Sequence, residues 1–295
     1  MRVFLQIDRS ELLKENGPCA YLFSLFRSGK EKAKERLSAF KERLKEQARF
    51  CKAASIQRVP RIVTGVLRVL DQNRLLGRNV SVVGTNALYA YEAAAGVFLD
   101  SPVLATRDMD ILWDIRSRLK LVVVDEQPGS GMLGLLRKAD RSFELVERQD
   151  FRAVNKDGYL VDLIKPEPRN VFTRERRRMG AKGDLEAAEI RNLQWLVSSP
   201  KLKQVVIGDD GYPAAMACPD PRAFALHKIW LSDQLDRNPL KKKRDRQQAL
   251  AVAYLVSRYL PQYRFTSPEL RMFPKEVFTA AARAFSDQKA PPGFE

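Results

Sequence analysis

Two aspartates stand at alternate positions in the stretch Thr106-Arg107-Asp108-Met109-Asp110-Ile111-Leu112. In a strand, alternation puts Asp108 and Asp110 on one face and Met109 and Ile111 on the other. Aspartate has a poor strand propensity and a buried charge is costly, so two carboxylates on one face need a cation between them. Oxygen-only ligands suit Mg²⁺, and the stretch therefore predicts a metal-binding strand.

A phosphate-binding turn is predicted upstream of this strand. Asn79–Val83 is a short apolar run, and Thr85–Ala95 reads as a helix with Gly96 as its C-cap. Gly84 allows close backbone approach where the helix begins, and the exposed N–H groups there favour phosphate. The Thr85 hydroxyl can donate to a phosphate oxygen, although threonine is also an ordinary N-cap residue.

A third aspartate, Asp162, lies in the strand-like run Tyr159–Ile164. The turn Asn155-Lys156-Asp157-Gly158 precedes it and predicts a hairpin, which brings a new strand alongside. An edge-strand aspartate facing water is the alternative. The apolar neighbours Val161 and Leu163 favour a buried strand, and with it a functional Asp162.

The ordered set of Gly84-Thr85, Asp108-x-Asp110 and Asp162 resembles the nucleotidyltransferase fold of the polymerase β superfamily. The fuller strings Gly84-Thr85-Asn86-Ala87-Leu88-Tyr89-Ala90-Tyr91-Glu92 and Thr106-Arg107-Asp108-Met109-Asp110 look like a bacterial family with this fold. A looser similarity runs to the AbiEii/MenT type of toxin transferases. The resemblance covers residues 77–166, with a weaker part over residues 220–255.

The resemblance implies an α+β fold, with a mixed sheet core, N-terminal helices and a C-terminal helical domain. It also implies a Mg²⁺-dependent enzyme that moves NMP from an NTP to an acceptor, and it leaves a toxin role open. Asp108 and Asp110 would bridge two metal ions, and Asp162 would complete the site or act as the base for the acceptor hydroxyl. Gly84 and Thr85 would hold the triphosphate.

A lysine and an aspartate lie on apolar helical stripes near the C-terminus. Lys228 shares a stripe with Phe224 and Leu231, and Asp245 shares one with Val252. Buried charges pair or serve a ligand. Lys228 matches the lysine that faces nucleotide phosphates in AbiEii/MenT-like transferases, which makes it a nucleotide-binding candidate. A purely structural pair of Lys228 with Asp245 explains the pattern equally well.

Net charge favours a polyanionic partner. The chain of 295 residues has a formal net charge of +16, with basic clusters at Arg174–Arg178 and Lys241–Arg244. Such an excess favours nucleic acid, and together with the family analogy it favours RNA such as tRNA as the acceptor. A solvated basic surface is the alternative. A protein or small-molecule acceptor, and a nucleic-acid-binding protein that no longer catalyses, remain competing interpretations.

The cysteine and histidine content and the hydropathy of the chain exclude several classes of protein. Three scattered cysteines form neither a disulfide framework nor a zinc spacing, and one histidine, His227, excludes multi-histidine metal sites. No apolar run is long enough to span a bilayer, and no signal-peptide core is present, so a cytoplasmic protein is expected.

We expect an N-terminal helical region over residues 1–76, a nucleotidyltransferase core over 77–183 and a mainly helical domain over 184–295. Lys30–Lys52 predicts a charged amphipathic helix, either a solvated arm or an RNA-contacting surface. Leu119–Val124 predicts a further strand, and residues 184–198 predict a helix.

Overall fold

The computed structural model describes residues 18–116, 131–168, 177–180 and 182–286. By its contacts the chain divides into two compact units, Met1–Ile56 and Gln57–Glu295. Within the described ranges, every helix is too short or too polar to cross a bilayer. The expected division at residues 76 and 183 stays a prediction.

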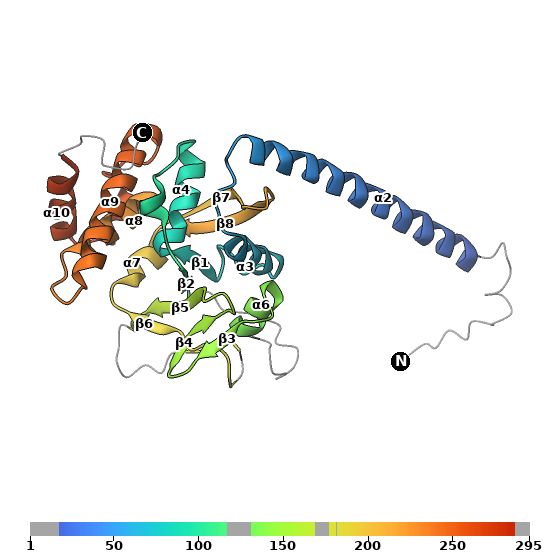
Figure 1. Ribbon diagram of the computed structural model, residues 1–295, viewed down its shortest axis with the longest axis horizontal. Helices are drawn as coiled ribbons and strands as arrows, with labels where there is room; N and C mark the ends of the chain where they lie inside the picture. The colour runs from blue at the N-terminus through green and yellow to red at the C-terminus, as the bar shows by residue number, and fades with distance from the viewer. Residues whose placement is uncertain (1–17, 117–130, 169–176, 181, 287–295) are drawn as a thin grey trace, which may run out of the picture. The chain divides into compact units, whose positions relative to one another are not determined.

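The described part of the first unit is formed mainly by the helix α2 (Pro18–Ala53) (Figure 1). Its sequence is dense in Lys, Arg, Glu, Leu and Ala, which have high helix propensities. The helix predicted over Lys30–Lys52 is therefore confirmed, and it begins earlier than expected.

A six-stranded mixed sheet forms the centre of the second unit (Figure 1). Its strands are β1 (Val80–Val83), β2 (Asp108–Trp113), β3 (Glu144–Val146), β4 (Gln149–Val154), β5 (Leu160–Pro166) and β6 (Ala188–Ile190). They lie in the order β1-β2-β5-β4-β3, and β6 pairs with the far end of β5. β5 is parallel to β2 and to β6, whereas the other pairs are antiparallel. The predicted α+β class with a mixed sheet is confirmed.

The hairpin between β4 and β5 forms where the sequence predicts it. Gly158 has a φ of 74°, which favours glycine, and the Asn155 side chain accepts from the backbone N–H groups of Asp157 and Tyr159. The turn sets the register, so that Arg152 stands opposite Asp162 across the ladder.

Helices and a second sheet surround this core. A two-stranded ribbon joins β7 (Lys201–Ile207) to β8 (Pro213–Pro219). The remaining helices are α3 (Arg61–Gln72), the 3-10 turn η1 (Gly84–Ala87), α4 (Leu88–Ala95), α5 (Ser101–Leu104), α6 (Met132–Ala139), α7 (Leu193–Ser198), α8 (Pro221–Ser232), α9 (Pro239–Tyr259), η2 (Pro268–Leu270) and α10 (Lys275–Ser286). As predicted, Gly96 ends α4 in the left-handed conformation, with a φ of 67°.

The central sheet separates two groups of buried side chains. Ile111 of β2 belongs to the core that includes α3, α4 and α6, and Leu112 belongs to the core that includes α7, α8 and α10. Residues two apart on a strand share a face. Asp108 and Asp110 therefore lie on the Leu112 face, toward the C-terminal helices, which gather on one side of Figure 1.

Two predicted elements differ from the structure or fall outside it. The helix predicted over residues 184–198 is wrong in its first half, because Ala188–Ile190 pairs with β5 as a strand. Asn192 then adopts a left-handed φ of 63°, and only Leu193–Ser198 is helical. The strand predicted at Leu119–Val124 lies outside the described residues.

Candidate active site

Three aspartates lie on one face of neighbouring parallel strands. In the ladder between β2 and β5, Asp110 stands directly opposite Asp162. Asp108 is two residues before Asp110 and shares its face, whereas Met109 and Ile111 point into the opposite core with no exposed surface. The structure thus brings together the three carboxylates that were proposed from sequence.

The Asp110 carboxylate is packed against Gly84. Gly84 has a φ of 66°, and a Cβ atom at this position would lie 2.2 Å from Asp110 Oδ2. Burial, together with the charges of Asp108 and Asp162, raises the pKa of Asp110 to about 7, and the charges of Lys228 and Lys241 oppose this rise. A cation bound at this face would relieve the same repulsion.

The Asp108 segment is held through its backbone. Its carbonyl oxygen accepts from Asn86 Nδ2 at 2.6 Å and from the Tyr159 hydroxyl at 3.2 Å. The Thr106 hydroxyl donates to the Asp108 carboxylate. These contacts fix the strand end while leaving Asp108 beside a cavity of about 510 Å³. The cavity is lined by Ala105, Thr106, Arg107, Asp108, Leu160 and Arg244.

Asp162 is bound by an arginine that the sequence analysis missed. Arg152 donates from Nε and from Nη2 to the two carboxylate oxygens of Asp162, both at 2.7 Å. Its Nη1 donates to the Gln149 side chain at 2.9 Å. The hairpin register could have indicated Arg152, since counting back from the Asn155–Gly158 turn places it opposite Asp162.

The carboxylates only partly form a metal site. In the part of the chain that the structure describes, no three Asp, Glu, His or Cys side chains are arranged to hold a metal ion. Both Asp162 oxygens accept from Arg152, which offsets the charge of Asp162. Asp108 and Asp110 are the other two carboxylates on this face. Their hard oxygen ligands, set on a face where negative charges repel, fit a divalent cation such as Mg²⁺.

The hydrogen bonds of the Thr85 hydroxyl show where its proton is free to point. Its oxygen accepts from Arg244 Nη2 at 3.0 Å and from Gln248 Nε2 at 3.1 Å. Gln248 Nε2 also donates to the Val103 carbonyl, which fixes the orientation of the amide. A hydroxyl has one proton and two acceptor sites, so the Thr85 proton remains for an incoming oxygen.

Lys228 forms the predicted pair with Asp245 and also lies near the aspartates. Its Nζ donates to Asp245 Oδ1 at 2.6 Å, while Arg237 binds the other Asp245 oxygen. Burial lowers the pKa of Lys228, and the charges of Asp245 and Asp110 oppose that shift. The ion pair fits a structural role for Lys228, and its charge acting on Asp110 fits a nucleotide-binding role. Both alternatives from the sequence therefore remain open.

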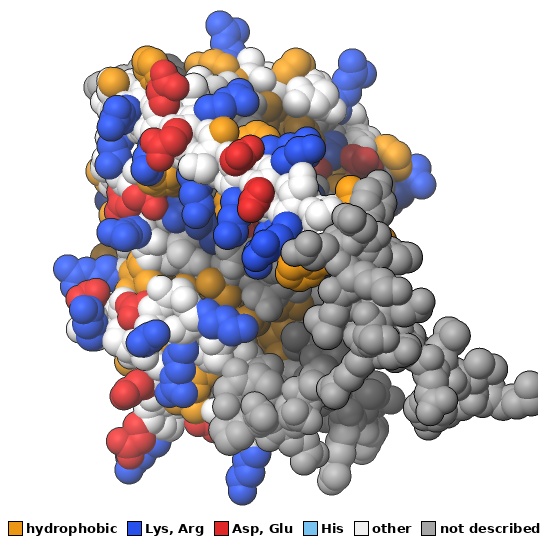
Figure 2. Space-filling view, turned by 90° about the vertical axis from the view of Figure 1, so that its right-hand side faces the viewer, with side chains coloured by type: hydrophobic (Ala, Val, Ile, Leu, Met, Phe, Trp, Pro, Cys, Tyr) orange, Lys and Arg blue, Asp and Glu red, His pale blue; other side chains and the backbone are white. Residues whose placement is uncertain are grey.

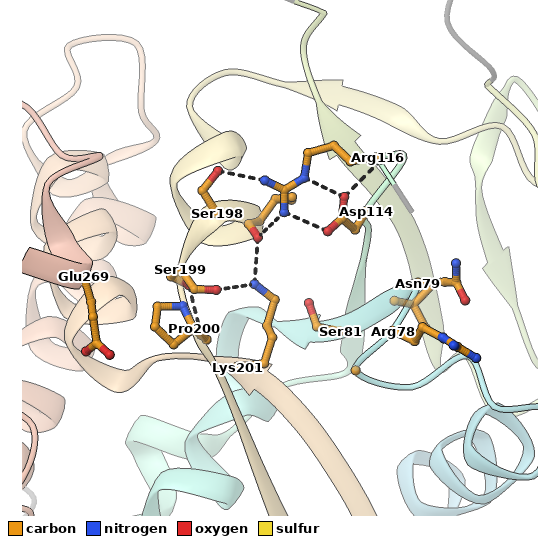
Figure 3. Close-up of a pocket in the computed structure, with 13 residues that line it drawn as sticks. Arg78, Asn79, Ser81, Asp114, Arg116, Ser198, Ser199, Pro200, Lys201 and Glu269 are labelled. Carbon is orange, nitrogen blue, oxygen red and sulfur yellow. Dashed lines mark hydrogen bonds and ion pairs between the residues drawn. The ribbon is translucent and has the colours of Figure 1, made fainter. Parts of the chain in front are cut away.

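A second pocket, of about 490 Å³, lies at the opposite end of β1 and β2 (Figure 3). Lys201 Nζ donates there to the carbonyls of Leu196, Val197 and Ser199 at 2.7 to 2.9 Å. Arg116 is bound to Asp114 through Nε and Nη2. All three ammonium protons of Lys201 are used within the protein, so this pocket is a structural clamp on the end of α7.

Fold and site together describe an enzyme of phosphoryl chemistry: a mixed sheet with paired aspartates, a glycine turn and buried cations. The model of the nucleotidyltransferase family matches residues 61–269, which is most of the chain. The chain therefore belongs to the nucleotidyltransferase family and is a nucleotidyltransferase, an enzyme that transfers a nucleoside monophosphate from an NTP. No curated protein and no solved structure matches it.

Proposed function

We propose that this enzyme transfers NMP to RNA such as tRNA, and that Asp108 and Asp110 hold Mg²⁺ for the reaction. The observation that carries the proposal is the shared face of Asp108, Asp110 and Asp162, with the Gly84 backbone against the second of them. A divalent ion bound there would stabilise the negative charge that develops at phosphorus during transfer.

The chain's own groups are suited to bind the triphosphate. The free Thr85 proton can donate to a phosphate oxygen, and Arg244 lies beside it. Arg244 Nε is buried without a hydrogen-bond partner among the described residues, and the same side chain lines the cavity beside Asp108. A buried donor without a partner is costly, and a phosphate oxygen would satisfy it. Lys228 adds a buried positive charge on the same side of the site.

Asp162 is proposed as the third carboxylate. In the described arrangement each of its oxygens accepts one hydrogen bond from Arg152 and keeps a second acceptor site, through which it can act on an acceptor hydroxyl. Arg152→Gln separates two possibilities. Faster transfer would mean that Arg152 restrains Asp162, and slower transfer would mean that Arg152 positions it.

The central experiment is incubation of the protein with each α-labelled NTP, Mg²⁺ and total cellular RNA, followed by a gel for label transfer. Asp108→Asn and Asp110→Asn should abolish transfer and keep the fold. Asp157→Asn is the matched control, since this aspartate lies exposed in a turn of the same sheet. Full activity of either active-site variant would reject the assignment.

The RNA acceptor rests on charge and on the family resemblance. Lys and Arg side chains are scattered among Asp and Glu over the face drawn in Figure 2. Of the predicted basic clusters, Arg177 and Arg178 pair with Glu186, and residues 174–176 lie outside the described residues. RNA affinity should fall with salt, with a log–log slope of about −0.7 per phosphate contact for single strands.

Failure of RNA binding at low salt would favour a protein or small-molecule acceptor. The toxin role implied by the AbiEii/MenT resemblance is tested by growth. Expression of the wild type should slow bacterial growth and Asp110→Asn should not, whereas equal growth would remove this role.

A further inference from the structure

Helix α2 (Pro18–Ala53) carries a narrow apolar stripe with a strict seven-residue repeat. The first and fourth positions of the repeat run from Phe23 to Leu44. They are occupied by Phe23, Phe26, Ala33, Leu37, Phe40 and Leu44, and Lys30 is the single polar residue among them. An unsupported amphipathic helix follows a period of 3.6 residues, so its apolar face drifts by about 20° per heptad. A stripe that keeps the seven-residue period is the seam of a coiled coil.

The side chains of this seam are exposed. Phe26 is 66% exposed, Leu37 56%, Phe40 58% and Leu44 42%. Burying one such side chain contributes roughly 1.5–3 kcal/mol. A row of them therefore provides a surface on which a second helix can dock.

The two flanks of the seam are basic. The fifth position of the repeat holds Arg27, Lys34 and Lys41, and the seventh holds Gly29, Arg36 and Arg43. The acidic residues of the same segment all lie on the far side of the helix. They are Glu31, Glu35, Glu42 and Glu46. Charges at the fifth and seventh positions select the partner in a coiled coil.

This charge pattern decides between occupants. A second copy of α2 would place basic flanks against basic flanks in either orientation, which is repulsive. RNA phosphates would contact the lysines and arginines but would leave Leu37, Phe40 and Leu44 in water. A membrane-surface helix needs apolar residues on at least one flank as well, and from Lys30 onward both flanks here are charged.

We propose that α2 forms one strand of a coiled coil with a helix of another protein that carries acidic residues beside its own apolar seam. The partner would cover the Phe26–Leu44 stripe with leucine-like side chains and pair its carboxylates with the flanking lysines and arginines. The seam belongs to the first unit and the aspartates to the second, and the proposal does not depend on the transfer reaction.

The test uses the full-length protein and labelled designed peptides about four heptads long, read by fluorescence anisotropy. One peptide has Leu in the seam and Glu on both flanks. A second has Lys on both flanks, and a third is a scrambled version of the first. The Glu-flanked peptide should bind, and the Lys-flanked and scrambled peptides should not. Equal binding of the scrambled peptide would show that net charge alone attracts the peptide, which would overturn the proposal.

Two sets of variants locate the binding. Leu37→Ser with Leu44→Ser should weaken binding by at least about tenfold, since burial of one leucine is worth about that factor. Ala39→Ser, on the far side of the helix, is the matched control and should bind normally. Reversing Lys34, Arg36, Lys41 and Arg43 to Glu should switch the preference to the Lys-flanked peptide.

The competing occupants have distinct readouts. Vesicles of phosphatidylcholine with and without phosphatidylserine test a membrane surface, and sedimentation of the full-length protein tests a second copy. Binding to anionic vesicles that is lost in Leu37→Ser with Leu44→Ser, without binding to the Glu-flanked peptide, would overturn the proposal. Self-association that is lost in the same variant would do so as well.

Discussion

Gly84 is the residue on which the site geometry depends most directly. Its left-handed backbone, with a φ of 66°, turns the chain from β1 into η1 and brings the main chain against Asp110 Oδ2. Any side chain there would occupy the space of the carboxylate. Gly96 has nearly the same backbone conformation, with a φ of 67°, but a Cβ atom on it would meet nothing within 4 Å.

Alanine variants of these two glycines distinguish the cost of a left-handed backbone from the cost of crowding Asp110. Gly84→Ala and Gly96→Ala should each lose roughly 1–2 kcal/mol of stability through the left-handed backbone. Only Gly84→Ala should also lose NMP transfer, because its methyl group displaces the Asp110 carboxylate. Thermal melts and label transfer measure the two effects. Equal activity of both variants would show that Asp110 tolerates displacement.

His227 is the only histidine in the chain and is buried beside Trp195 and Trp230. Burial, together with the neighbouring charge of Lys228, lowers its pKa from 6.5 to about 3. Between about pH 6.5 and pH 3, His227 therefore binds a proton in the unfolded chain but not in the folded chain. The stabilising contribution is complete above about pH 6.5 and is lost progressively as the pH falls toward 3.

The free energy of unfolding should fall by about 2 kcal/mol between pH 7 and pH 5 through His227 alone, at about 1.4 kcal/mol per pH unit. His227→Phe keeps an aromatic ring in the cluster and removes the titrating group. Urea unfolding at the two pH values should show a smaller loss in this variant. The same loss in both proteins would assign the acid sensitivity to carboxylates.

At the scale of elements, the basic residues at the start of α9 differ in whether they act on the candidate active site. The sequence treats Lys241–Arg244 as one basic cluster. In the structure Arg244 donates to Thr85, and the charge of Lys241 acts on Asp110. Lys243 is exposed. Helical spacing explains the division, because positions three or four apart share a face, as Lys241, Arg244 and Gln248 do.

This division predicts different effects for neighbouring substitutions. Arg244→Gln should weaken NTP binding by about tenfold or more, because a charge-assisted hydrogen bond contributes roughly 1.5–3 kcal/mol. Lys243→Gln should leave NTP binding unchanged. Equilibrium titration with a non-hydrolysable NTP analogue measures both. Equal loss in the two variants would mean that overall charge attracts the nucleotide.

At the scale of the whole molecule, the family match begins at residue 61, beyond α2 and the unit Met1–Ile56. The second unit contains both buried cores within the residues that the structure describes. A protein lacking residues 1–56 should therefore keep its melting temperature and its NTP affinity.

A longer deletion provides the contrast. Removing residues 1–72 also deletes α3, whose buried side chains include Val63, Val66, Leu67 and Leu70. Loss of several core aliphatic side chains costs more than the usual stability of a domain, so this protein should not fold. Circular dichroism and gel filtration distinguish the two deletions. A first deletion that unfolds would show that α2 is part of the core.

The sequence by itself determined what depends on local rules. Strand alternation placed Asp108 and Asp110 on one face, and the Asn155–Gly158 turn delivered Asp162 on a neighbouring strand. Gly96 ended its helix as expected, since a left-handed C-cap is a local requirement. The helix predicted over residues 184–198 failed in its first half, because pairing with β5 outweighed helix propensity there.

Only the tertiary structure decided which cations meet these carboxylates. Arg244 reaches Thr85 across 159 positions of sequence, and Lys228 and Lys241 come to Asp110 from helices far along the chain. No periodicity encodes such meetings, because they follow from how α8 and α9 pack on one face of the sheet. Arg152 is the intermediate case, because the hairpin register fixes its place but only the packed side chains show that it binds both oxygens of Asp162.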